Sequence, residues 1–269
     1  MQLTGNLDNK EPLILKECEY LPSIEGYEWQ DLQLDLQREF RRAKLDIKII
    51  LTEDSIQSQY DLFKRLNSGG LHLEDQEIRN CLIIMLDENF YDKVNDLKEY
   101  ENFKKCLSLS QDKLEKEYHM ELILRFFIAK HKKTNYSKYK MSQSLLQEFI
   151  DDETAELIND EGFNINKEIE TFKKTFDFLK NTLGSDSFKK YNPDKDKFER
   201  GFSNASFELI ASGVANNLDK LEQIGKDNFI NKVKELYRTS EAQDLLKRGM
   251  KALPRFKGMA ELSSDYFSR

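Results

Sequence analysis

The chain is poor in the residues that interrupt helices and in those that build disulfide or zinc scaffolds. Its 269 residues include only 4 prolines, 11 glycines, 3 cysteines and 3 histidines. Cys18, Cys81 and Cys106 are far apart, odd in number and without a Cys-x-x-Cys pair. That pattern argues against a disulfide framework or a zinc site and favours a reducing compartment. Scarce proline and glycine leave helices uninterrupted, so a mainly α-helical protein is expected.

Long apolar runs are missing as well. No stretch approaches the roughly 20 consecutive apolar residues that a membrane-spanning helix needs. The first residues show no basic start followed by an apolar core, so we expect no signal peptide. These absences predict a cytoplasmic protein without a membrane partner.

The chain lacks the overall positive charge that would attract nucleic acid over its whole surface. Charged residues make up 34% of the chain, hydrophobic residues 39%, and the formal net charge is −7. A nucleic-acid contact would therefore require a local basic patch. The length suits one large domain or two modest ones with a real core.

Only the first 53 residues have a strand pattern. Pro12-Leu-Ile-Leu15 is a short apolar run, and Leu45-Asp-Ile-Lys-Ile-Ile-Leu51 alternates apolar and polar residues as a strand does. A helix is expected between them, over 31–40. Because two short strands do not form a stable sheet alone, residues 1–53 are interpreted as a partial α/β segment whose other strands lie in missing sequence or in a partner.

From residue 54 onward the pattern indicates successive helices. We expect a helical domain over 54–150 and a second over 151–269, so the whole is a mainly α, multi-helix bundle with a small N-terminal strand-containing portion. The expected helices cover 54–66, 74–86, 111–131, 142–150, 166–183, 204–218, 226–237 and 242–251. The helix that begins at Asn204 is rich in small residues and is interpreted as a closely packed core seam; an interface between two copies of the chain is the alternative.

The corner between the first two of these helices has an unusual composition. Arg65-Leu-Asn-Ser-Gly-Gly70 is followed by Glu77-Ile-Arg-Asn80. Bare glycine backbone, the N-terminal amides of a helix and a guanidinium are the groups that bind phosphate. The candidate residues for a nucleotide or phosphate site are Arg65, Asn67, Gly69, Gly70, Glu77, Arg79 and Asn80.

In such a site Arg65 and Asn67 would bind the anion and Glu77 would orient Arg79. The alternative is a helix hairpin in which Arg65 and Arg79 pair with Glu77 or Glu74 and Asn67 caps a helix end. Both interpretations stay open from the sequence.

Two further features involve charged side chains. Glu121 and Arg125 are four residues apart on an expected helix and can pair, and the neighbouring aromatic residues suggest a partly buried structural role. A basic patch interleaved with aromatic residues could contact a phosphate backbone and stack bases; solvated cations at a helix end are the alternative. The nucleic-acid candidates are Lys130, Lys132, Lys133, Tyr136, Lys138 and Tyr139.

These runs resemble the ParB-like DGQQR-domain family, typified by the N-terminal domain of GmrSD-type modification-dependent restriction enzymes. The resemblance is carried by residues 46–51, the R-L-N-x-G-G corner at 65–70, Leu73 and the E-I-R-N run at 77–80. The run Glu121-Leu-Ile-Leu-Arg-Phe-Phe-Ile-Ala129 matches the family's E-x-x-L-R-F-x-A helix, and Tyr139 with Phe149 fits its Y…F spacing. The match covers residues 40–150 and is loose beyond them.

The resemblance implies a role in bacterial defence against phage or foreign DNA. The family's DGQQR motif is absent from this chain, and so is the histidine-rich HNH nuclease domain that often follows it. We therefore expect no catalytic residue and no metal ligand in the chain itself. An NTP with Mg²⁺ is implied for the complete protein, in which this helical part would complete or regulate a nuclease site carried by a missing ParB-like half or partner chain.

Two functions from other classes remain open at this point. The helices could form a non-catalytic interaction module that binds an effector partner. The Lys130–Lys140 patch could bind DNA directly, in which case the affinity should fall steeply with salt.

Overall fold

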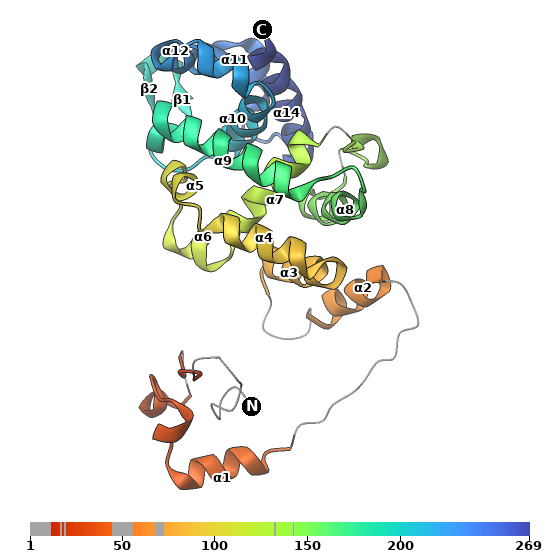
Figure 1. The fold of residues 1–269 in the computed structure, drawn as a ribbon, viewed down its shortest axis with the longest axis vertical. Helices are drawn as coiled ribbons and strands as arrows, with labels where there is room; N and C mark the ends of the chain where they lie inside the picture. Colours follow the sequence, from red (N-terminus) through yellow and green to blue (C-terminus); the bar gives the residue numbers. More distant parts are fainter. Residues whose placement is uncertain are drawn as a thin grey trace. The chain divides into compact units, whose positions relative to one another are not determined.

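The computed structural model describes residues 12–16, 18, 20–44, 56–67, 73–131, 133–141 and 143–269, without the side chains of residues 56, 57 and 67. The chain divides into two compact units, 1–53 and 54–269. Each is described by itself. Figure 1 shows the path of the chain.

The described part of the first unit contains one α-helix and two short 3₁₀ turns. These are η2 (Pro22–Ile24), η3 (Trp29–Asp31) and α1 (Leu34–Arg42). The Trp29 ring packs edge-on against Phe40 with 5.4 Å between centroids, and the Gln37 amide donates to the Trp29 and Leu32 carbonyls. The apolar run at 12–15 forms no strand, and the strand expected over 45–51 lies outside the described residues.

The second unit is helical, and the mainly α fold expected from composition is confirmed. Its described α-helices are α2 (Ile56–Asn67), α3 (Asp75–Leu86), α4 (Glu88–Lys98), α5 (Glu101–Cys106), α6 (Gln111–Glu115), α7 (Tyr118–Lys130), α8 (Leu146–Asn159), α9 (Ile165–Thr182), α10 (Asn204–Asn216), α11 (Leu218–Gln223), α12 (Lys226–Arg238), α13 (Ser240–Leu245) and α14 (Ala252–Ser268). Its short 3₁₀ turns are η4 (Tyr136–Lys138), η5 (Gly184–Asp186) and η6 (Pro193–Lys195). None of the described helices has the length and apolar character needed to cross a membrane.

The strands of the described residues are two residues long and come late in the sequence, after residue 190. β1 (Tyr191–Asn192) pairs antiparallel with β2 (Lys197–Phe198), with Tyr191 opposite Phe198. Asp196 adopts a left-handed conformation, φ 45°, at the turn between them. This hairpin was not expected, because a two-residue strand is too short to show an alternating pattern.

Helix α7 is the centre of the second unit (Figure 1). It contacts α3, α4, α8, α10 and α14, and every residue from His119 to Ile128 is buried. Aromatic rings fill the space between α7, α5 and α9, where Phe126 packs edge-on against Phe172 with centroids 5.2 Å apart. A helix covered on all sides has no polar face, so its sequence carries no clear amphipathic period.

Two expectations about this unit are wrong. The long helix expected over 111–131 is two helices, because Glu117 takes a left-handed conformation with φ 53° between α6 and α7. The domain boundary expected after residue 150 falls inside α8, and the helices on both sides of it belong to one compact unit.

The small-residue helix is a core seam, as expected. α10 is buried from Ser206 to Ala215 and packs along α14. At the closest point, a Cβ added to Gly213 would lie 1.8 Å from the Ser263 hydroxyl and 2.7 Å from its carbonyl carbon. Glycine is therefore required at position 213 for the two helices to approach this closely.

Candidate functional site

Arg79, a candidate residue for the phosphate site, lies completely buried on α3. Its side chain has no solvent exposure. Nε donates to Asp151 Oδ1 at 2.7 Å, Nη1 to Gln76 Oε1 at 2.5 Å and Nη2 to Gln147 Oε1 at 2.7 Å. Three of its five N–H donors are used in these bonds, and the complete burial of the side chain leaves no solvent access for a phosphate.

Glu121 on α7 connects Arg79 to a second buried arginine. Its carboxylate lies 3.6 Å from Arg79 Nη1 and accepts from the Gln147 amide at 3.3 Å. The expected pair with Arg125 is confirmed, with 2.5 Å between Glu121 Oε1 and Arg125 Nη2. Both partners are 4% exposed, so this pair belongs to the core and not to the surface.

The contacts continue from Arg125 into the C-terminal helices. Arg125 Nη1 donates to Glu208 of α10 at 2.8 Å. Glu208 is fully buried and also accepts from Arg255 of α14, at 2.9 Å from Nε and 3.2 Å from Nη2. Arg255 is 20% exposed, so this end of the chain of contacts reaches the surface.

At the other end, Asp151 of α8 joins two helices. Tyr60 and Lys64 of α2 donate to Asp151 Oδ2 at 2.9 and 3.1 Å, while Arg79 of α3 bonds to Oδ1. Burial, followed by the charge of Asp151, raises the pKa of the Tyr60 hydroxyl, which therefore stays protonated as a donor. One carboxylate thus holds both helices that flank the glycine corner.

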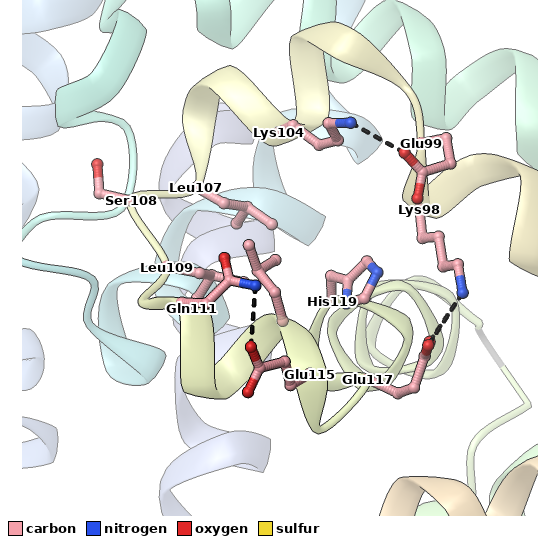
Figure 2. Close-up of a pocket in the computed structure, with 11 residues that line it drawn as sticks. Lys98, Glu99, Lys104, Leu107, Ser108, Leu109, Gln111, Glu115, Glu117 and His119 are labelled. Carbon is pink, nitrogen blue, oxygen red and sulfur yellow. Dashed lines mark hydrogen bonds and ion pairs between the residues drawn. The ribbon is translucent and has the colours of Figure 1, made fainter. Parts of the chain in front are cut away.

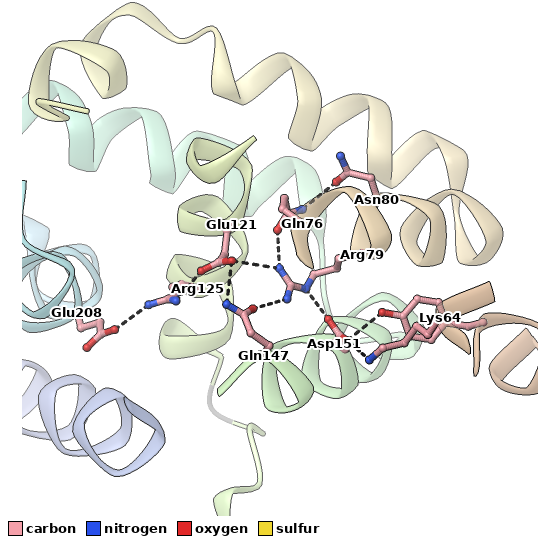
Figure 3. Close-up of polar contacts among 10 residues, drawn as sticks. Lys64, Gln76, Arg79, Asn80, Glu121, Arg125, Gln147, Asp151 and Glu208 are labelled. Carbon is pink, nitrogen blue, oxygen red and sulfur yellow. Dashed lines mark hydrogen bonds and ion pairs between the residues drawn. The ribbon is translucent and has the colours of Figure 1, made fainter. Parts of the chain in front are cut away.

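We call this set of residues the buried charge ladder, because its charges alternate in sign along the path. Figure 3 shows the ladder crossing from α2 to α10 through α8, α3 and α7. Alternation gives each buried charge at least one opposite neighbour, which offsets the cost of removing it from water. The ladder consists of Lys64, Asp151, Arg79, Glu121, Arg125, Glu208 and Arg255.

The structure corrects the roles assigned to three corner residues. Glu77 does not orient Arg79, and neither Glu77 nor Glu74 pairs with it. Instead the Glu77 carboxylate accepts from the Glu74 backbone N–H at 2.8 Å, which completes a capping box at the start of α3. The Asn80 side chain accepts from Gln76 at 2.8 Å. Glu77 and Asn80 therefore make local contacts within α3 and at its start, separate from those of Arg79.

The remaining candidates lie toward the corner itself. Arg65 is exposed on the last turn of α2. Gly69 and Gly70 lie outside the described residues, as does the side chain of Asn67. Among these four candidates, Arg65 is therefore the one whose side chain lies in the described part of the corner.

The basic patch is largely neutralised by neighbouring acids. Lys130 lies 2.9 Å from Glu168, Lys133 lies 2.6 Å from Asp160, and Lys138 lies 3.0 Å from Glu156. Lys132 lies outside the described residues. Paired lysines release few counterions on binding a phosphate backbone, so this arrangement weakens the DNA-binding interpretation.

The two aromatic candidates in the patch face inward. Tyr136 stacks on Phe149 at 5.2 Å and 15° between ring planes, and Tyr139 packs edge-on against the same ring at 5.0 Å. The Tyr139 hydroxyl donates to Glu153 at 3.1 Å. Rings packed in this way stabilise the loop before α8 and are not platforms for nucleobases.

Asp160 makes a testable contribution to acid stability. The hydrogen bond from Lys133, with the Gly162 N–H and His131, lowers the pKa of this carboxyl from 3.8 to about 2. A lowered folded-state pKa stabilises the protein above pH 3.8, and that contribution is lost as the pH falls toward about 2. Asp160→Asn should therefore lose less stability than the parent over this interval, as measured by urea unfolding at several pH values.

The control for this prediction is Asp92→Asn, which removes a negative charge at an exposed position of α4. Equal pH dependence in the parent and in Asp160→Asn would show that the ion pair with Lys133 has no role in acid stability.

Two of the three ladder carboxylates were not identified from the sequence. Asp151 follows the helix expected over 142–150, yet it lies in the middle of α8. Glu208 carried a usable signal: it is a lone carboxylate in a helix of otherwise small, apolar or uncharged residues, and a buried charge requires a partner. The identity of that partner is set by tertiary contact and cannot be read from spacing.

Among the described residues, no three His, Cys, Asp or Glu side chains lie close enough together to hold a metal ion. The chain was also compared with known proteins. No family model, curated protein or solved structure matches it.

Proposed function

We propose that this chain is the helical part of a DGQQR-type bacterial defence protein, and that it holds the corner at residues 65–73 against a nucleotide-dependent nuclease site in another polypeptide. The chain would complete or regulate that site without catalysing the reaction. The proposal rests on the family resemblance of the corner and on one structural observation, the shared anchoring of its two helices.

That observation is the convergence of α2 and α3 on Asp151. Tyr60 and Lys64 reach it from the helix before the corner and Arg79 from the helix after it. A functional loop is positioned best by rigid elements whose own side chains are held by buried contacts. The arrangement therefore supports a corner with fixed ends that presents Arg65 and Asn67 to a ligand.

A role without catalysis is supported by the chemistry of the buried groups. Each ladder carboxylate has at least one cationic partner within 4 Å. Groups held in this way stabilise packing, whereas a general acid or base must reach a substrate proton. We infer that α3, α7 and α8 support the corner and take no part in chemistry.

The test combines association with nucleotide binding. The full chain is mixed with a polypeptide that carries the DGQQR motif from the same genome, and complex formation is measured by analytical ultracentrifugation. Binding of Mg²⁺-ATP and Mg²⁺-GTP to the complex is then measured by calorimetry. Arg65→Ala and Asn67→Ala should each weaken nucleotide binding by about tenfold or more, the effect of losing a hydrogen bond to a charged group.

Arg248→Ala, at an exposed position before α14, is the matched control and should bind as the parent does. Failure to associate would contradict the proposal. Association without nucleotide binding in the parent would favour the interaction module instead. Equal nucleotide affinity in the parent and both corner variants would show that the corner does not contact the nucleotide.

A further inference from the structure

A pocket of about 400 Å³ opens between the end of α4, the α5–α6 connection and the start of α7, away from the buried charge ladder. Figure 2 draws the side chains that line it, with Leu107, Leu109 and His119 near its centre. Leu107, Leu109 and Leu114 form its apolar surface, and His119 lies among its polar residues. A concave site with apolar walls and a few polar groups is the usual form of a small-molecule site.

Four of the five charged residues of this pocket form two ion pairs. Lys98 lies 3.0 Å from Glu117, and Lys104 lies 2.9 Å from Glu99. The Gln111 amide donates to Glu115 at 3.0 Å. Glu115 has no cationic partner among the lining residues, so the lining carries one net negative charge. An anion would lose its hydration beside that charge, so the lining favours an uncharged ligand over an anion.

His119 is the polar residue whose hydrogen bonding is incomplete. It is only 6% exposed, and its buried Nδ1 has no hydrogen-bond partner. Burial lowers the pKa of the imidazole below its ordinary value, against the opposing effect of Glu117. The charged groups that act on the ring are Glu117, Lys98, Glu99 and Lys104.

At neutral pH this imidazole is therefore uncharged and offers one donor and one acceptor. A buried polar group without a partner costs free energy. A ligand that forms a hydrogen bond with the His119 ring would reduce this cost, because the protein itself leaves Nδ1 without a partner.

We propose that this pocket binds a small uncharged molecule that has an apolar body and one hydrogen-bonding group directed at His119. The leucines cover the apolar body, and the excess of carboxylates in the lining disfavours an anion of the same size. The inference does not depend on the proposed function of the corner, because no ladder or corner residue lines the pocket.

Three compounds of matched shape test the proposal. p-Cresol carries one hydroxyl, toluene carries none, and 4-methylbenzoate carries a negative charge on the same ring. Binding to the full chain at pH 7.5 is followed by ¹H–¹⁵N correlation spectra of the imidazoles. The chain has three histidines, so the His119 signals are identified by their loss in His119→Phe.

The expected order of affinity is p-cresol, then toluene, then 4-methylbenzoate. p-Cresol should bind about two- to tenfold more tightly than toluene, the range expected for one net hydrogen bond, and should shift the His119 signals. In His119→Phe the difference between p-cresol and toluene should disappear.

A second variant keeps the test decisive if His119→Phe does not fold. Leu114→Trp alters a partly exposed wall residue and should fill the pocket, so both neutral compounds should lose binding. The proposal is overturned if p-cresol does not shift the His119 signals, if toluene or 4-methylbenzoate binds as tightly as p-cresol, or if Leu114→Trp binds p-cresol as the parent does.

Discussion

Arg79→Met is expected to lower the free energy of unfolding by about 3–5 kcal/mol, the usual effect of removing one partner from a buried ion pair. Methionine keeps an unbranched side chain in place of the aliphatic part of Arg79 and removes the guanidinium, at a position with no solvent exposure. It removes the donors to Asp151, Gln76 and Gln147. Urea unfolding followed by circular dichroism at pH 7 measures the change.

Arg248→Met is the matched control. It makes the same substitution at an exposed position, where changes are usually within about 0.5 kcal/mol. A double-mutant cycle with Asp151→Asn then isolates the Arg79–Asp151 contribution, because the two residues are in direct contact. A loss below about 1 kcal/mol in Arg79→Met, comparable with an ordinary surface position, would contradict a central role for the ladder.

Gly213→Ala is expected to destabilise the protein by about 1–3 kcal/mol or more, the cost of overpacking a closely packed core. In an ordinary helix interior the same change stabilises by roughly 1 kcal/mol, because alanine has the higher helix propensity. At position 213 the added methyl group meets backbone atoms of Ser263 at 2.7 Å. Backbone cannot rotate away, so α10 and α14 would have to separate. Thermal unfolding of the parent and the variant shows directly whether the substitution lowers or raises the melting temperature.

Gly258→Ala is the control that separates packing from propensity. Gly258 also lies within a helix, α14, but its added Cβ would meet the tip of the Leu245 side chain at 2.6 Å. A side-chain tip can change rotamer, so Gly258→Ala should cost less than Gly213→Ala. An unchanged or raised melting temperature in Gly213→Ala would show that the seam between α10 and α14 is looser than described.

The sequence predicted the positions of helices more reliably than their buried faces. Helix α3 was expected over 74–86 and spans Asp75–Leu86. The apolar residues at helical spacing, Ile78, Cys81, Leu82 and Met85, predict its inward face. The buried residues are instead Gln76, Arg79, Leu82 and Ile83. An apolar period cannot reveal a face that is buried through polar contacts, because the partners Asp151 and Gln147 are about 70 residues away.

The candidate site shows the same limit. Glu121 and Arg125 were correctly paired because an i, i+4 spacing is a local property of a helix. Arg79 and Glu77 were candidates for a phosphate site, with a helix hairpin as the alternative, because both lie near the glycine corner in sequence. Their actual partners are set by the packing of α3 on α8 and by the capping geometry at Glu74, neither of which sequence proximity encodes.

The convergence of α2 and α3 on Asp151 has a consequence for protein engineering. Since the ends of the connecting segment are held by Tyr60, Lys64 and Arg79, the spacing of the two helices does not have to be maintained by the segment itself. Closing a longer connection costs only about 0.6 kcal/mol for each doubling of its length. Peptides inserted between Asn67 and Leu73 should therefore leave the helical scaffold folded, which makes this position a natural place to display a foreign loop.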